Sequence, residues 1–171
     1  MAGRECRQGD LLLREGAQRP LHDGEHLSMN GVATIRSVGH DLAAKAVQVA
    51  VAKGGEAGCP LVAAVVGATG ELVALLRATG APFPSSQIAQ DKAYTAASFK
   101  VPSPDVYKMV AGNPALSGGI AAKPGIAMFG GGLPIAIAGE IVGAIGVSGG
   151  TEEQDTQCAN AALISIGATQ Y

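Results

Sequence analysis

The chain has 171 residues, 47% of them hydrophobic but only 4% aromatic, with 25 glycines and no tryptophan. This length indicates one domain, and the composition indicates a core of small aliphatic side chains in close contact. The formal net charge is −2, and no cluster of Lys and Arg offers the basic surface that nucleic-acid-binding proteins use, so DNA and RNA are excluded as partners. No apolar run reaches the length of a membrane span, which argues against a membrane partner.

Three cysteines, Cys6, Cys59 and Cys158, are scattered without a CxxC or Cys/His spacing. An odd number at such spacings argues against a disulfide framework and a zinc site, and it fits a reducing compartment. The run Leu11–Leu13 is too short for the apolar part of a signal peptide. We therefore expect a cytoplasmic protein without a bound metal ion.

Residues 1–28 contain most of the Arg residues and two of the three His residues, and they show no apolar periodicity. This composition predicts a flexible tail, followed by a single domain over residues 29–171. His22 and His26 have the i, i+4 spacing of a helical metal site. In so polar a segment, a solvated pair explains them better.

The first periodic pattern runs from Ser37 to about Gly54 and predicts a helix with one apolar face. Leu61–Val66 is a short, continuous apolar run, typical of a buried strand. The turn residues Ala68–Gly70 connect it to a second strand, Glu71–Arg77. Together these segments predict an antiparallel hairpin.

A helix from about Gln87 to Phe99, capped by Ser85 and Ser86, is predicted next. Its apolar stripe contains one charged residue, Lys92. A lysine in such a place must reach solvent, pair with a carboxylate or a backbone carbonyl, or face a pocket. The carboxylates that could pair with it are those of Glu140, Glu153 and Asp155.

Residues 100–123 are rich in Pro and Gly and predict a long loop with one short helix, Pro104–Met109. We expect the loop to form the rim or lid of a pocket. A short strand, Gly125–Met128, is predicted to lead into the first of two glycine clusters.

The two glycine clusters, Gly130–Gly132 and Ser148–Gly150, enclose a second hairpin. Its predicted strands are Ile135–Ala138 and Ile141–Val147, connected by Gly139 and Glu140. Glycines inside the second strand, at 143 and 146, indicate that another element packs closely there.

Thr151 and the acidic residues after it predict the start of the last helix. The small residues of this helix, from Ala159 to Ala168, allow close helix approach. We expect them to form a subunit interface in a homo-oligomer.

The order helix, two strands, helix, loop, three strands, helix indicates an α+β fold in which helices flank an antiparallel sheet. No G-x-G-x-x-G lies between a strand and a helix, and no G-x-x-x-x-G-K-[ST] is present, so neither kind of nucleotide site is expected. His40 is the only histidine after residue 28, and no Ser-His-Asp or Cys-His arrangement can be assembled.

Three ordered stretches carry a family resemblance: Val65–Val73, Ile88–Phe99, and Phe129–Gly150 with the following Glu-x-x-Asp. They resemble the GlcG/HbpS family, whose haem-binding-protein-like domain also occurs at the C-terminus of some corrinoid adenosyltransferases. The resemblance covers about residues 30–168 and implies a profilin-like fold. Because it begins just after Met29, that residue is an alternative start of the protein. At Gly67 the family usually has Asp, so a turn-capping carboxylate is missing there.

The glycine clusters offer backbone N–H groups, the second cluster at a helix start, and this arrangement suits a carboxylate or another anion. Lys92 would add a cation, Tyr94 and Thr95 hydroxyl groups, and Phe99 an apolar wall. If the protein is an enzyme, Lys92 and Tyr94 are the expected catalytic residues. The expected ligand-binding residues are Thr95, Phe99, Gly130, Gly131, Gly132, Pro134, Glu140, Ser148, Gly149, Gly150 and Asp155.

A pocket of this kind suits a small organic acid or a macrocycle with propionate groups. The resemblance implies a small-ligand-binding protein for haem, another tetrapyrrole or an anionic organic ligand, although the core motifs contain no His or Cys to bind iron. One alternative is an enzyme or accessory protein in the catabolism of small organic or aromatic acids, with Lys92 or Tyr94 as the acid or base. The second alternative is a structural subunit of an oligomer.

Overall fold

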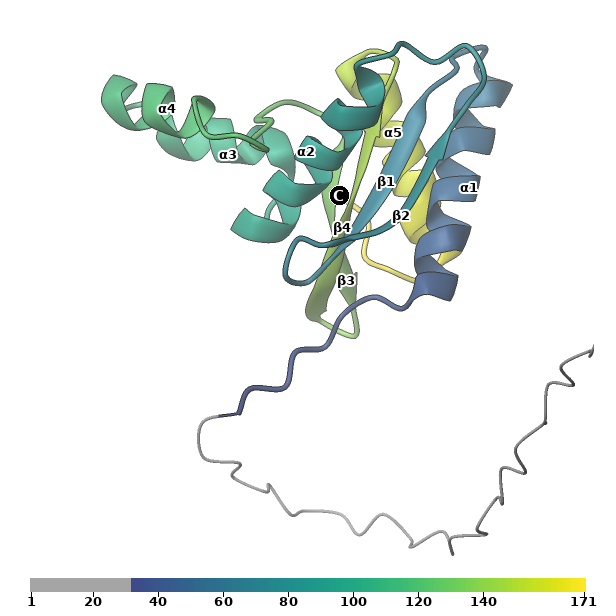
Figure 1. Cartoon of the computed structure of the whole chain (residues 1–171), viewed down its shortest axis with the longest axis horizontal. Coiled ribbons are helices and arrows are strands. Elements are labelled where there is room, and N and C mark those ends of the chain that lie inside the picture. Colours follow the sequence, from purple (N-terminus) through teal and green to yellow (C-terminus); the bar gives the residue numbers. More distant parts are fainter. Residues whose placement is uncertain (1–31) are drawn as a thin grey trace, which may run out of the picture. The chain divides into compact units, whose positions relative to one another are not determined.

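Four antiparallel strands form one sheet in residues 32–171, in the order β2-β1-β4-β3, with helices on both faces (Figure 1). The structure is a computed structural model, and it describes these residues. The elements are α1 (His40–Glu56), β1 (Val62–Gly67), β2 (Leu72–Arg77), α2 (Ser85–Phe99), α3 (Ser103–Val110), α4 (Pro114–Ala121), β3 (Gly132–Ile137), β4 (Glu140–Ser148) and α5 (Glu152–Ser165). The predicted α+β fold, an antiparallel sheet flanked by helices in a profilin-like arrangement, is confirmed.

The predictions for the N-terminal tail, for the histidine pair and for Met29 lie outside the described residues. In the part of the chain that the structure describes, no helix combines the length and the apolar character needed to cross a membrane.

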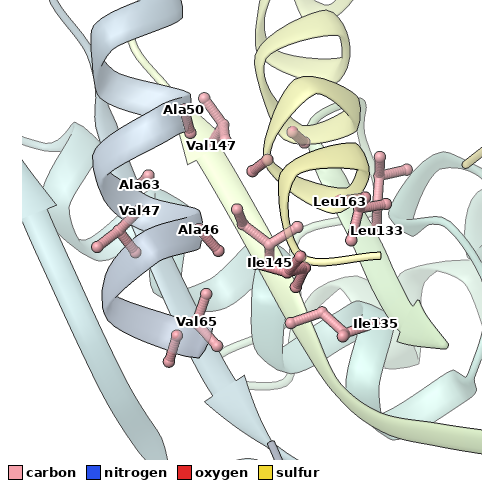
Figure 2. Close-up of a cluster of buried hydrophobic side chains, with 14 of the residues drawn as sticks. Ala46, Val47, Ala50, Ala63, Val65, Leu133, Ile135, Ile145, Val147 and Leu163 are labelled. Carbon is pink, nitrogen blue, oxygen red and sulfur yellow. The ribbon is translucent and has the colours of Figure 1, made fainter. Parts of the chain in front are cut away.

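The helices α1 and α5 cover one face of the sheet and bury the main hydrophobic core (Figure 2). Small side chains dominate it, as the composition predicts, and they let the two helices lie close to the strands. The labelled core residues are Ala46, Val47, Ala50, Ala63, Val65, Leu133, Ile135, Ile145, Val147 and Leu163.

The helix α2 covers the opposite face, over β1, β3 and β4. It lies very close to β4 because β4 has a glycine at the contact. A Cβ built on Gly146 would lie 2.0 Å from the carbonyl oxygen of Ala89, so any side chain there would push the helix off the sheet. The close approach predicted for this strand is confirmed.

The segment predicted as a loop contains a second helix, α4. The Asn113 side chain accepts a hydrogen bond from the Leu116 N–H at 3.1 Å and caps this helix. Pro114 occupies the first helical position, where its missing N–H costs nothing. The residues that predicted a loop are therefore compatible with a short helix.

Two details of the strand prediction are wrong. Residues Gly125–Met128 form no strand, and the sheet resumes at Gly132. The connection of the second hairpin is Ala138–Gly139, one residue earlier than predicted, since Ile137 pairs with Glu140.

The helices α3 and α4 project from the sheet as an arm (Figure 1). Helix α3 contacts α2 and β3, whereas α4 contacts α3 and buries none of its residues. Among the helices of residues 32–171, α4 is therefore the one with the least support from the core.

The small-residue face of α5 is buried inside the chain. Ala159 and Ala162 have no exposed surface and belong to the core that α5 shares with α1. This face is not available to another subunit, so the prediction of an interface there is wrong. The hydroxyl cap predicted at the start of α5 is confirmed, because the Thr151 side chain accepts a bond from the Gln154 N–H.

Candidate functional site

Lys92 belongs to α2, and its side chain, 2% exposed, extends from α2 into the interior toward the end of β4. Its Nζ donates to Asp155 Oδ2 at 2.8 Å and to the carbonyl oxygen of Val147 at 2.9 Å. Of the three carboxylates predicted as partners, Asp155 is the one that pairs with it. The ring centroid of Phe129 lies 4.8 Å from Nζ and adds a cation–π contact.

Asp155 is held at both carboxylate oxygens. Oδ1 accepts a hydrogen bond from the Gly150 N–H at 3.0 Å, while Oδ2 bonds Lys92. The residue lies in the first turn of α5, where the helix dipole favours a negative charge. The pair therefore joins α2 on one face of the sheet to α5 on the other, and its charged groups are engaged inside the protein.

The glycine clusters present N–H groups to side chains of the protein itself. The Gly130 N–H donates to Glu152 Oε2 at 2.6 Å, and the Gly132 N–H donates to Ser103 Oγ at 3.0 Å. With the bond from the second cluster to Asp155, two of these three acceptors are carboxylates. The anions next to the clusters are thus the chain's own side chains.

The other predicted site residues are spread over the fold. Thr95 is buried, and its hydroxyl donates to the Asp91 carbonyl at 2.7 Å and accepts from the Ala127 N–H at 2.8 Å. Gly131 packs against the Lys92 ammonium group and Gly149 against Leu61. Three more are buried or half-buried: Phe99 at the end of α2, Pro134 in β3 and Ser148 at the end of β4.

Glu140 lies at the opposite end of β4 from Ser148. They are eight residue steps apart along the strand, which is about 26 Å. There Glu140 Oε2 pairs with Arg36 Nη1 at 2.8 Å. The structure therefore does not bring Glu140 to the glycine clusters.

Tyr94 lies apart from the Lys92 pair and is 40% exposed. Its ring stands between Gly70 and Gly125, which both have positive φ. A Cβ on Gly70 would lie 2.8 Å from the ring, and one on Gly125 would lie 3.5 Å from it. The missing side chain at Gly70 makes room for the ring, and the two glycines fix its position.

The edge strand β2 forms one wall of a groove beside α2. Alternate residues of β1 point toward α2, where they pack with its alanines. Directly opposite residues of antiparallel strands share a face. The pairs concerned are Val62 with Arg77, Ala64 with Leu75, and Val66 with Leu72. Because α2 lies over β1 and β4, Leu72 and Leu75 remain 49% and 37% exposed.

The helix α2 forms the other wall with Gln87, Gln90 and Tyr94, which share a face at i, i+3, i+7 spacing. Two hollows of about 390 and 640 Å³ open here and share the two glutamines. The first lies at Tyr94, and the second reaches Arg77 and Phe83, whose ring is 89% exposed. We call this surface the α2/β2 groove, made of Leu72, Leu75, Arg77, Phe83, Gln87, Gln90 and Tyr94.

The α2/β2 groove has an apolar floor with a phenol at one end and a guanidinium group at the other. The strand from Leu72 to Arg77 is about 16 Å long. Arg77 donates to the carbonyl oxygen of Ala81, which holds it beside the groove. Such a surface suits a flat apolar ligand with an acidic group.

Few metal-binding side chains are available near this groove. In residues 32–171 no three His, Cys, Asp or Glu side chains gather into a metal site. His40 lies at the start of α1 with a side chain 88% exposed, outside the groove. Burial raises the pKa of the Cys158 thiol, which keeps it protonated and a poor ligand. Two oxygen donors line the hollow at Tyr94, namely the Tyr94 phenol and the Asp91 carboxylate. The Asp91 carboxylate accepts a hydrogen bond from the Gln87 side chain at 2.7 Å, whereas Tyr94 is 40% exposed.

Tyr94 is the one residue of the groove that the sequence had identified as a candidate site residue. The spacing of Gln87, Gln90 and Tyr94 marks one polar face of a helix, and this signal could have linked them. The wall from β2 depends on that strand lying at the sheet edge, which the hairpin pattern does not reveal.

Comparisons with known proteins agree with the fold described above. Residues 38–164 match the family described as "Haem degrading protein HbpS-like". The chain is 35% identical over 136 residues to an uncharacterized 15.0 kDa protein from the dhaT-dhaS intergenic region of Citrobacter freundii, a match that covers 79% of this chain and 96% of that protein.

Two further similarities concern PduO. The chain is 33% identical over 118 residues to the corrinoid adenosyltransferase PduO of Citrobacter freundii, covering 68% of this chain and 35% of PduO, so it spans about a third of that enzyme's length. The crystal structure of a PduOC:haem complex superposes with a TM-score of 0.72 at 27% identity, over 79% of this chain and 99% of that one.

Proposed function

Because this chain belongs to the HbpS-like family, we propose that it is a small-ligand-binding protein whose ligand is haem or a related tetrapyrrole. The observation that carries the proposal is the position of Tyr94 in the α2/β2 groove. There an oxygen donor stands beside exposed leucines, with a cation at the far end. The PduOC relative, whose structure is a haem complex, supports the same ligand class.

The residues of the groove fit the chemistry of haem. Tyrosine is one of the side chains that bind haem iron in proteins, with histidine, cysteine and methionine. Tyr94 would hold the iron, Leu72 and Leu75 would pack on the macrocycle, and Arg77 would bond a propionate. When bound, haem supplies a redox-active iron. The chain's own part is to orient the ring and keep water from one of its faces.

Several finer points belong to the same proposal. An anionic organic ligand with a flat apolar body would use the same groove and is the alternative ligand. An acid or base role of Lys92 in organic-acid catabolism has less support, since its ammonium group is engaged with Asp155 and Val147. We also propose a cytoplasmic homo-oligomer, supported by exposed apolar residues on the α3–α4 arm, namely Tyr107, Met109 and Leu116.

The test is a titration of the purified protein with haemin, followed by absorbance. We expect saturable binding with a shifted Soret band, and we expect Tyr94→Phe to weaken binding at least tenfold and change the band. Tyr107→Phe is the matched control, because this tyrosine lies on α3 and is similarly exposed, at 53%. An unchanged spectrum in Tyr94→Phe would refute the site. Absence of any Soret shift in the wild type would refute haem as the ligand.

A further inference from the structure

We propose a second binding site, for an organic carboxylate with an apolar body, at the C-terminal end of α2. A cavity of about 560 Å³ lies there, between the segment before α1, the β1–β2 turn, the end of α2 and the β3–β4 hairpin. None of the residues of the α2/β2 groove lines it. The inference therefore does not depend on the proposed haem site.

The charges of the cavity favour one anion. Arg36, Lys100 and Glu140 line it, and Arg36 pairs with Glu140 at 2.8 Å. Within residues 32–171, Lys100 has no carboxylate at ion-pair distance. The cavity thus carries one net positive charge. A guanidinium group has five N–H donors, so the bond to Glu140 leaves Arg36 able to bind a second carboxylate.

The rest of the lining favours an organic anion over an inorganic one. Ala97, Ile141 and Ile35 contribute apolar surface beside the charged groups. Ile35 is 60% exposed and would lose that exposure under a ligand. Burial of apolar area stabilises a complex only if the ligand itself has an apolar body. We therefore assign the site to a monocarboxylate that carries an aromatic or aliphatic body.

The backbone of Lys100 gives an independent indication. Lys100 ends α2 in the left-handed conformation, with φ 59° and ψ 29°. Glycine adopts this conformation without cost and is the usual residue at this cap. A cap alone needs no charge. A lysine at this position lacks the conformational advantage of glycine, but it places an ammonium group at the cavity. A ligand that binds this charge would explain why lysine occupies the cap.

The experiment is a titration with 2-naphthoate at low salt, followed by ¹H–¹⁵N NMR and calorimetry. We expect saturable amide shifts at Ala97, Lys100 and Ile141. Lys100→Gly should weaken binding at least tenfold and at the same time raise the melting temperature, because glycine suits the cap. Arg36→Met should also weaken binding at least tenfold, whereas Lys100→Arg should retain it. Lys53→Met removes the same charge from α1 and should leave binding unchanged.

Three results would overturn the proposal. One is the absence of saturable shifts at these amides in the wild type. Another concerns Lys100→Gly. The proposal fails if this variant binds 2-naphthoate as tightly as the wild type, or if its binding weakens while its melting temperature falls. The third is fully competitive displacement of 2-naphthoate by haemin, or loss of 2-naphthoate binding in Tyr94→Phe without haemin, since either would make this cavity part of the haem site.

Discussion

The ion pair between Lys92 and Asp155 is 2% and 3% exposed, whereas the other ion pairs in residues 32–171 have side chains at least 39% exposed. Removing two charges from water is costly, and the mutual attraction offsets this cost only while both partners are present. The fold therefore requires a cation and a carboxylate together at two positions that are 63 residues apart in the chain.

Loss of one partner of this pair should destabilise the fold strongly. Lys92→Met leaves the Asp155 carboxylate buried without its cation, and we expect a loss of about 3–5 kcal/mol in the free energy of unfolding. Urea unfolding followed by circular dichroism measures it. The double variant Lys92→Met with Asp155→Leu should recover much of the loss. Lys53→Met, from an exposed ion pair, is the control and should change stability little. Equal stability of Lys92→Met and the wild type would contradict this account.

Ala138 is a non-glycine residue with φ 52°, the first of two residues that turn β3 into β4. Both turn residues have positive φ, as a type I′ turn requires, and Asn-Gly is the preferred sequence for it. Ala138→Asn should therefore raise the free energy of unfolding by about 1 kcal/mol, since asparagine tolerates this conformation better than alanine. Urea unfolding tests it, with Ala138→Val expected to destabilise. A lower stability of the Asn variant would show that the turn is not strained.

The residue Gly67 shows how a sequence departure can be compensated. Sequence reasoning expected a missing turn-capping carboxylate there. A Cβ on Gly67 would lie 1.9 Å from Glu71 Oε1, so the carboxylate of Glu71 occupies that space. The Thr69 hydroxyl donates to it and lowers the pKa of Glu71. The capping group is thus present but comes from four residues later in the chain.

At the level of the elements, α4 is the one helix of residues 32–171 without a buried residue. Eight residues are too few for a stable isolated helix in water, and within the chain α4 is supported mainly by its contacts with α3 and by the Asn113 cap. In the monomer, we expect its amides to exchange hydrogen faster than those of α1, α2 and α5. Hydrogen exchange at low protein concentration measures this. Protection equal to that of α5 would contradict this expectation.

The elements that the sequence predicted best are those whose boundaries carry local signals. Both hairpins, the body of α2 and the capped start of α5 followed from turn residues, apolar spacing and a capping hydroxyl. The predicted start of α2 is wrong: the helix begins at Ser85 after Pro84, and neither Ser85 nor Ser86 caps it with its side chain. The helix α4 was missed because Pro114 and two glycines were interpreted as loop residues, although Pro is accepted at the first helical position. Residues Gly125–Met128 resemble a strand in composition, but they bond α2 instead of the sheet. The Ala127 N–H donates to the Thr95 hydroxyl, which also donates to the Gly125 carbonyl.

At the scale of the whole molecule, the site was less predictable than the fold. Lys92 and Asp155 were each identified from the sequence, and their pairing was one of three alternatives. The α2/β2 groove depends on the order of the strands, which leaves β2 at an edge with Leu72 exposed. Strand order results from contacts between distant segments, and neither apolar periodicity nor turn residues encode it.

The close contact between α2 and Gly146 has a consequence for ligand binding. Tyr94 and Lys100 belong to the same helix and its cap, and that helix lies on β4 with no space for even one methyl group at the contact. Movement of α2 toward the sheet at this contact is therefore blocked. If a haem at Tyr94 changes the affinity for a carboxylate at Lys100 by some factor, the carboxylate must change the affinity for haem by the same factor, because coupling free energies are reciprocal.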